Sequence, residues 1–297
     1  MPSRYEKNEK KRKNARKKKH RSFLKKFTIF LIILIIGLII WGKFGEPNIL
    51  AINEYKVKSD NLPDSFNGAK VIHFSDIHYG TGFNEKRLKN LVNKINSMKP
   101  DIVIFTGDLI DKNYNATDSD IKTIINYLSK IESKLGKYAS VGNHDFYNEN
   151  FDNIMYDSGF NVLKNNYDTI YNKTNKPIVI YGIDNITYGN PKVSTLTNKA
   201  IDNISYKIVI LHEPDYIDEF INNYDVDLIL AGHSHGGQAK LPLVKPFYLP
   251  DNAKNYYDKF YKVENTDIYI SNGVGNSIVD FRLFSTPSIN VYRFSAK

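Results

Sequence analysis

The chain has 297 residues, of which 41% are hydrophobic and 25% are charged. These fractions are typical of a globular protein, and they exclude a wholly disordered, collagen-like or multi-spanning membrane chain. The length allows one large α/β domain with appendages. Because the chain contains no cysteine, disulfides, thiolate metal sites and cysteine nucleophiles are excluded as well.

The net charge of +9 comes from a short amino-terminal tail. Residues 1–26 contain 13 of the 41 basic residues but only 2 of the 32 acidic residues. The remaining 28 basic and 30 acidic residues give residues 27–297 a net charge of −2. Such a body has no positive field to attract a polyanion, so we expect it to bind no nucleic acid.

An apolar segment follows the basic tail. Between Phe27 and Trp41 the only polar side chain is that of Thr28, and the run ends before Lys43. The segment is at the short limit of the about 17 to 25 residues that cross a bilayer, and we predict a transmembrane anchor at residues 27–44. The positive-inside rule then keeps residues 1–26 in the cytoplasm. It places the body, residues 45–297, outside, in a single-pass protein of the cell membrane.

Other interpretations of the apolar segment are less well supported. A cleaved signal peptide should end in small residues, and no A-x-A site follows Trp41. Residues 20–25 resemble a twin-arginine export signal, but His20 replaces its first arginine. A cleaved signal peptide or a twin-arginine signal would also place the body outside the membrane. A buried core helix is disfavoured because the segment has no polar face and follows 13 basic residues.

From residue 50 onward, short apolar runs alternate with segments of helical spacing, as in folds whose strands alternate with covering helices. We predict buried strands at residues 71–74, 102–105, 138–141, 178–181, 208–211, 228–230 and 268–270. Apolar residues three and four apart predict one-faced helices at residues 88–95, after an Asn84 N-cap, and at 121–128. Residues 185–200 and 240–265 lack clear periodicity and are predicted to be surface loops.

Five of the predicted strands run directly into residues of the types that bind metals. The motifs are Asp76-Ile77-His78, Gly107-Asp108-Leu109-Ile110-Asp111, Gly142-Asn143-His144-Asp145, His212-Glu213-Pro214 and Gly232-His233-Ser234-His235. The carboxyl ends of strands line the ligand crevice of open α/β sheets, so these side chains should converge. Any one motif alone would indicate a turn or a helix cap, but five that agree favour a metal site. Imidazoles and carboxylates without thiolates suit Mn, Fe or Zn.

This ordered set of motifs resembles the calcineurin-like metallophosphoesterase family over about residues 65–295. The sequence G-H-x-H-G-G-Q at residues 232–238 is similar to its membrane-associated bacterial branch, which contains lipid-headgroup hydrolases. The resemblance implies an α/β fold, a four-layer α/β/β/α sandwich, that holds two divalent metal ions, with manganese, iron or zinc as candidates. It implies that Asp76, His78 and His235 bind the first metal, that Asn143, His212 and His233 bind the second, and that Asp108 bridges both.

The resemblance also implies that His144 is catalytic without binding metal, and that it stabilises the reacting phosphoryl group or protonates the leaving oxygen. Asp111 and Asp145 are interpreted as residues that orient the ligands. His73 lies within a predicted strand and is interpreted as structural.

The apolar segment from Leu241 to Pro250 allows two interpretations. It is either an ordinary packed loop or a lip that touches the bilayer or a lipid tail, with Lys240 and Lys245 facing anionic headgroups.

We therefore predict a membrane-anchored, metal-dependent phosphoesterase. Its substrate would contain a phosphodiester or pyrophosphate bond, as in a lipid or cell-envelope intermediate. One alternative is a phosphomonoesterase. Another is a non-catalytic tether whose basic tail binds anionic lipid or RNA, although the complete set of ligand-type residues argues against it. No oligomeric state follows from the sequence.

Overall fold

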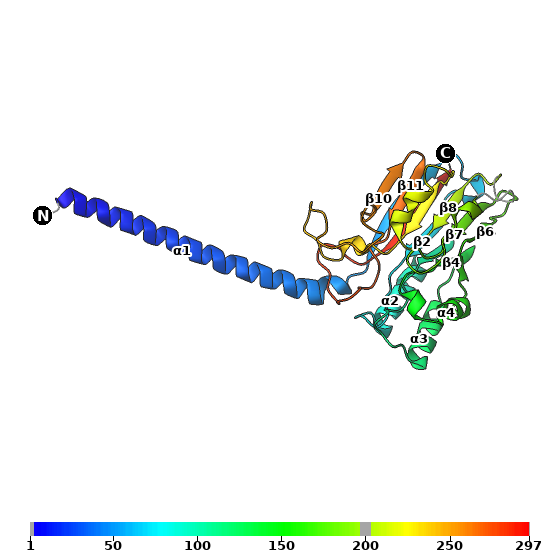
Figure 1. Cartoon of the computed structure of the whole chain (residues 1–297), viewed down its shortest axis with the longest axis horizontal. Helices are drawn as coiled ribbons and strands as arrows, with labels where there is room; N and C mark the ends of the chain where they lie inside the picture. The colour runs from blue at the N-terminus through cyan, green and yellow to red at the C-terminus, as the bar shows by residue number, and fades with distance from the viewer. Residues whose placement is uncertain (1–2, 197–202, 297) are drawn as a thin grey trace.

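The computed structural model describes residues 3–196 and 203–296. A long helix, α1 (Arg4–Ile40), projects from a body built on two six-stranded sheets (Figure 1). The helices α2 (Glu85–Ser97), α3 (Asp118–Leu128) and α4 (Phe151–Asp157) belong to the body. The short helices are η1 (Trp41–Gly45), η2 (Glu46–Asn48), η3 (Asp64–Phe66), η4 (Asp145–Tyr147), η5 (Val193–Leu196), η6 (Pro214–Glu219) and η7 (His235–Gly237).

The first sheet has the strand order β1-β12-β2-β3-β4-β5. Its strands are β1 (Ala51–Ser59), β12 (Ser288–Ala296), β2 (Lys70–Phe74), β3 (Ile102–Thr106), β4 (Gly136–Ser140) and β5 (Asn161–Val162). The last four in this order are parallel to one another, whereas β12 is antiparallel to β2. The carboxyl ends of β2, β3 and β4 therefore lie at the same edge.

The second sheet has the order β10-β11-β9-β8-β7-β6. Its strands are β10 (Phe260–Val263), β11 (Thr266–Ile270), β9 (Leu228–Ala231), β8 (Lys207–Ile210), β7 (Ile178–Gly182) and β6 (Asn166–Ile170). The four inner strands are parallel, and the two edge strands are antiparallel to their neighbours. The ends of β8 and β9 thus also share one edge.

Successive side chains of each strand point to opposite faces of its sheet, and the two sheets together therefore pack in three hydrophobic layers. Between the sheets, residues such as Ile102 and Ile104 pack with Ile208 and Leu230. The opposite face of the first sheet packs against helices, including Leu88 of α2. The opposite face of the second sheet is covered by Ile217, Phe220 and other residues of η6 and its flanking loops. The four-layer fold class is confirmed, with a 3₁₀ helix and loops as its fourth layer.

All seven predicted strands are confirmed to within two residues at each end, and Asn84 caps α2 by accepting a hydrogen bond from Arg87 N (3.2 Å). The prediction of a loop throughout residues 240–265 is wrong at its end, because Phe260–Val263 forms the edge strand β10. The strand exposes alternate residues, so its sequence lacks the apolar run of a buried strand. Residues 185–196 contain a loop and η5, and residues 197–200 of that predicted loop lie outside the described residues.

Helix α1 extends from the basic tail through the apolar segment without interruption. Within residues 3–196 and 203–296, it is the one helix long and apolar enough to cross a membrane. No residue of α1 is buried. The short helices η1 and η2 connect it to β1.

Candidate metal centre

The metal-type residues lie where five strands end, at the shared edge of both sheets. They follow the first sheet as Asp76, His78, Asp108, Asn143 and His144, and the second sheet as His212, His233 and His235. All of these residues are buried except Asn143, which is partly exposed but has a buried Oδ1 atom. The fold therefore brings together every site residue predicted from the sequence.

One group of side chains consists of Asp76, His78 and His235. The Nε2 atoms of the two histidines are 3.1 Å apart. Asp76 Oδ1 lies 3.4 Å from His235 Nε2 and 3.8 Å from His78 Nε2. These three donor atoms are therefore close enough to one another to hold a single metal ion.

A second group consists of Asp108, His212 and His233. His212 Nε2 lies 3.1 Å from His233 Nδ1. Asp108 Oδ2 is 3.2 Å from His212 Nε2 and 3.4 Å from His78 Nε2 of the first group. The Asp108 carboxylate therefore lies between the two groups.

These donors fit two divalent ions. Nitrogens that each lie about 2.1 Å from one ion, at tetrahedral or octahedral angles, are about 3.0 to 3.4 Å apart. Both histidine pairs have this spacing, at 3.1 Å. In addition, the buried Asn143 Oδ1 has no hydrogen-bond partner among the described residues, which leaves an amide oxygen available to a cation.

Five of these residues have left-handed backbone conformations, which side chains other than glycine adopt rarely. The φ angles are 53° at Asp76, 45° at His78, 63° at Asp108, 67° at His233 and 51° at His235. Each such residue costs about 1–2 kcal/mol, so the surrounding structure must hold it in place.

The Asp145 carboxylate holds two of the loops together. It accepts hydrogen bonds from the backbone nitrogens of Asp108 (2.9 Å), Leu109 (2.8 Å) and Gly142 (2.8 Å). Burial and the charge of Asp108 raise the pKa of Asp145 to about 7, against the effect of these hydrogen bonds. Asp145 thus orients the loops, as expected from the sequence, and does not point into either group.

Two histidines are oriented by hydrogen bonds of the ring nitrogen that faces away from the groups, and a third, His78, faces a carboxylate there without a hydrogen bond to it. His212 Nδ1 lies 2.6 Å from Thr106 O, and His233 Nε2 lies 2.8 Å from Asp251 O. His78 Nδ1 lies 3.3 Å from Asp111 Oδ2. Acceptors at these positions are typical of histidines that bind metals.

Carboxylates also keep two of these histidines protonated in the metal-free protein. Burial opposes their charge, but contacts with Asp111 and Asp76 outweigh it and raise the pKa of His78 to about 9. Burial likewise opposes the charge of His212, whose pKa is raised to about 10, chiefly by Asp108.

His144 has different surroundings. Lys112 N donates a hydrogen bond to its Nδ1 atom at 3.1 Å, which places the ring proton on Nε2. Burial lowers the pKa of His144 to about 4, and the charge of Asp108 offsets this only in part. The ring is therefore neutral at pH 7 and lines the pocket beside the two groups. One of its nitrogens is also within reach of His78 and Asp108.

A pocket of about 480 Å³ opens beside the two groups. Lys112 and Thr187 add polar atoms to its lining, and its other wall is apolar. The apolar wall contains Phe247, Tyr248, Pro250, Ile278 and Val279.

The structure also shows roles for two residues that had none in the sequence analysis. Glu213 accepts hydrogen bonds from Asn185 Nδ2 (2.8 Å) and Ile186 N (2.7 Å), and so orders the loop that carries Thr187. Arg282 is fully buried, and its Nη2 lies 3.0 Å from His235 Nδ1. The position of Glu213 directly after His212 could have indicated that it has a role at the site. No local sequence pattern indicates a role for Arg282.

His73 is structural, as interpreted from the sequence. Its ring lies 2.8 Å from Thr106 Oγ1 and 3.2 Å from the Tyr292 hydroxyl, and it takes no part in either group.

Comparison with known proteins gives one family. The family model described as "Calcineurin-like phosphoesterase" matches residues 69–237. An uncharacterized metallophosphoesterase of Bacillus subtilis, YkuE, is 32% identical over 255 residues, which cover 85% of this chain and 88% of that protein.

Two further relatives have more specific names. A transmembrane protein with metallophosphoesterase domain from Danio rerio is 26% identical, covering 88% of this chain and 61% of that protein. The UDP-2,3-diacylglucosamine pyrophosphatase LpxG of Chlamydia muridarum is 24% identical, covering 86% of this chain and 92% of that protein.

Proposed function

The chain belongs to the calcineurin-like phosphoesterase family, and we propose on that premise that it hydrolyses a phosphodiester or pyrophosphate bond at the outer surface of the cell membrane. Its cluster of metal-binding His and Asp residues is intact, so the chain is a metallophosphoesterase. The proposal adds to this the number of ions, the roles of individual residues, the substrate class and the location.

Two ions would be held by the two groups of donors. We assign Asp76, His78 and His235 to one ion, and Asn143, His212 and His233 to the other, with Asp108 shared by both. The observation that carries this assignment is the pair of 3.1 Å nitrogen separations on either side of the Asp108 carboxylate. Mn, Fe and Zn suit these donors.

Two divalent ions supply positive charge that stabilises both the attacking and the leaving oxygen in phosphoryl transfer. Among the residues of this chain, we assign His144 as the catalytic residue. Its neutral ring presents the Nε2–H group to a phosphoryl oxygen, because Lys112 N occupies the other nitrogen. Lys112 lines the same pocket, where its ammonium group attracts an anionic substrate.

The shape of the pocket favours a diester or pyrophosphate over a monoester. Phe247, Ile278 and Val279 form an apolar wall beside the metal-type residues. A diester or a pyrophosphate carries a substituent in addition to its leaving group, and this substituent would cover the wall. A monoester carries only its leaving group. The named activity of the Chlamydia relative, on a lipid-bearing pyrophosphate, agrees with a lipid or envelope substrate.

The location is proposed from α1. Its apolar segment is unburied, and 13 Lys and Arg residues precede it. The positive-inside rule then gives a single-pass protein with residues 1–26 in the cytoplasm, an anchor at 27–44 and the catalytic domain outside.

The test is a substrate panel with the purified full-length chain. The metal-free protein is reconstituted with Mn, Fe or Zn and assayed against bis-p-nitrophenyl phosphate, p-nitrophenyl phosphate and a nucleotide-sugar pyrophosphate. We expect the diester or the pyrophosphate to be hydrolysed faster than the monoester. Faster hydrolysis of the monoester would instead identify a phosphomonoesterase, and a fully loaded but inactive protein would identify a non-catalytic tether.

A further inference from the structure

Two loops that wall the metal pocket end in exposed apolar side chains. One loop contributes Phe247 and Tyr248 to the pocket, and the other contributes Ile278 and Val279. All four side chains are more than half exposed, and Leu243 at the tip of the first loop is fully exposed. Contiguous exposed apolar groups of this kind mark interaction surfaces.

The second of these loops is attached to the end of the anchor helix. Arg282 N donates to Gly42 O at 2.9 Å, and Lys43 Nζ donates to Asp280 O at 3.0 Å. The buried Glu46 carboxylate accepts hydrogen bonds from Phe284 N at 2.9 Å and Thr286 Oγ1 at 3.0 Å. The loop and the end of the anchor therefore form one structural unit.

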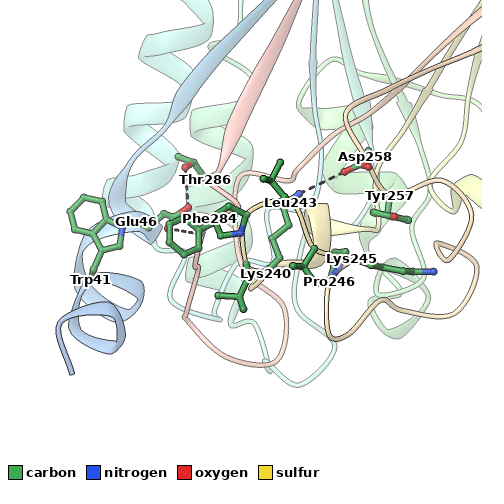
Figure 2. A pocket seen from close by; sticks show the side chains of 13 residues that line it. Trp41, Glu46, Lys240, Leu243, Lys245, Pro246, Tyr257, Asp258, Phe284 and Thr286 are labelled. Carbon is green, nitrogen blue, oxygen red and sulfur yellow. Dashed lines mark hydrogen bonds and ion pairs between the residues drawn. The ribbon is translucent and has the colours of Figure 1, made fainter. Parts of the chain in front are cut away.

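The first loop also lies beside the end of the anchor. A pocket of about 660 Å³ is lined by Trp41, Glu46 and residues 240–246. Figure 2 shows Trp41 and Glu46 on one side of it and Lys240, Leu243 and Pro246 on the other. In Figure 1, α1 leaves the body on the side where these loops project. Because Trp41 directly follows the apolar segment of α1, both loop tips lie close to the level at which the anchor leaves the membrane.

The charges around the tips suit an anionic membrane surface. Lys43, Lys240 and Lys245 flank the apolar side chains. Asp258 lies 3.7 Å from Lys240 Nζ, and Asp280 lies 3.2 Å from Arg87 Nη1 and 4.0 Å from Lys43 Nζ. These two carboxylates are outnumbered by the three lysines and Arg87, so a positive charge remains beside the tips. Lysines close to the membrane surface attract anionic headgroups.

We propose that the exposed apolar side chains of residues 241–248 and 278–284, which we term the lip, insert into the outer leaflet and open the metal pocket at the bilayer surface. The substrate is then an amphiphilic lipid that presents its phosphoryl group to the metal-type residues and its first apolar carbons to Phe247, Ile278 and Val279. This substrate class rests on the proposed hydrolytic function, whereas insertion of the lip rests only on the proposed membrane anchor.

Insertion is tested first, without any substrate. Because the chain contains no cysteine, Leu243→Cys creates a unique site for a fluorescent label. Tyr156→Cys, at an exposed position on α4, is the matched control. Both full-length proteins are reconstituted in vesicles of phosphatidylcholine and phosphatidylglycerol that contain lipid-borne nitroxide quenchers. Interfacial groups lie about 5–10 Å deep, so we expect quenching at position 243 at least about twice that at position 156.

Equal quenching at the two positions would overturn the proposal. So would protection of position 243 that is independent of lipid quenchers and accompanied by disulfide cross-linking between chains, because a second copy would then cover the lip. Quenching at position 243 in a protein without phosphoesterase activity would retain insertion and remove the proposed function.

The substrate class is tested with two diesters that share a leaving group. The vesicles are supplied with bis-p-nitrophenyl phosphate or with a diacylglyceryl p-nitrophenyl phosphate. We expect Leu243→Asp combined with Val244→Asp to lower hydrolysis of the lipid diester about tenfold or more while leaving the soluble diester unchanged. Tyr156→Asp should change neither rate. Parallel losses on both substrates, or no loss on the lipid diester, would contradict a role for the lip in substrate access.

Discussion

Asn143 and His144 are neighbours in the loop after β4, but their surroundings predict different effects of mutation. The Asn143 Oδ1 atom lacks a hydrogen-bond partner among the described residues, whereas His144 Nδ1 accepts one from Lys112 N. We expect Asn143→Ala to lower both metal content and turnover. His144→Ala should keep both ions and lose about 10² to 10⁴ in rate. Elemental analysis and kinetics on the same preparations check this, and loss of metal from His144→Ala would contradict the assignment.

The raised pKa values of His78 and His212 predict how metal binding depends on pH. Both rings are protonated at neutral pH in the metal-free protein, with pKa values of about 9 and about 10, and both must lose a proton to bind metal. We expect metal binding at pH 7 to release about two protons per chain, and apparent affinity to rise toward pH 10. Calorimetry in buffers of different ionisation enthalpy measures the release, and binding without proton release would contradict these pKa shifts.

The same shifts predict the stability of the metal-free protein. A histidine whose folded pKa is raised stabilises the fold fully below its ordinary pKa of 6.5, and this stability is lost as the pH rises through 9 and 10. The melting temperature of the metal-free protein should therefore fall as the pH rises from about 6.5 to about 10.

At the residue scale, the sequence was enough to predict which residues form the candidate site, but not their backbone conformations. Every residue assigned to the candidate site follows a predicted strand, because strand ends converge in this class of fold. The left-handed backbone at Asp76 and His78, and the approach of Arg282 to His235, depend on hydrogen bonds between distant segments. No local pattern encodes such contacts.

At the scale of elements, the loops after β3 and β4 meet at a close contact that only glycine permits. A Cβ atom on Gly142 would lie 2.2 Å from Asp108 Oδ1 and 2.5 Å from Asp108 N. We expect Gly142→Ala to displace the Asp108 carboxylate, reduce metal content and destabilise the protein by about 1–3 kcal/mol. Metal titration and thermal denaturation check both effects.

Gly68→Ala is the matched control for this change. A Cβ at Gly68 meets nothing within 4 Å, but its φ of 81° is unfavourable for alanine, at a cost of about 1–2 kcal/mol. Its metal content should remain full. If Gly142→Ala also binds both ions normally, the contact between the loops does not position Asp108.

The predictability of the strands follows the continuity of their apolar runs. Strands that are buried on both faces, such as β3 and β7, read as continuous apolar runs and were predicted. Strand β1 alternates partly exposed and exposed residues along most of its length, and β5 has only two residues. Neither carries an apolar run like those of the seven predicted strands. Strand β12 is mostly buried, but Asn290 and Arg293 interrupt its apolar residues, and it was not predicted either.

At the scale of the whole molecule, α1 and the body predict the outcome of surface proteolysis. With residues 1–26 held inside by their charge, a protease added to intact cells should digest the body. A cytoplasmic protein serves as the control for cell integrity. Digestion only after the cells are disrupted would contradict the orientation, and a soluble body that lacks the anchor would indicate cleavage.

The layer architecture could be predicted only through the resemblance of the motifs to a known family. Apolar runs indicate that strands exist but not how they pair. The last strand, β12, lies between β1 and β2, so it joins segments more than 200 residues apart. Neighbours so distant in sequence follow from tertiary packing and not from local pattern.

The central claim is that one chain binds two divalent ions around a shared Asp108 carboxylate. The most direct test is elemental analysis of the full-length protein after saturation with Mn at neutral pH, beside Asp108→Ala prepared in the same way. We expect two ions per chain for the unmodified protein and fewer for the variant, with loss of phosphoesterase activity in step with the metal. One ion or none at saturation in the unmodified protein would contradict it.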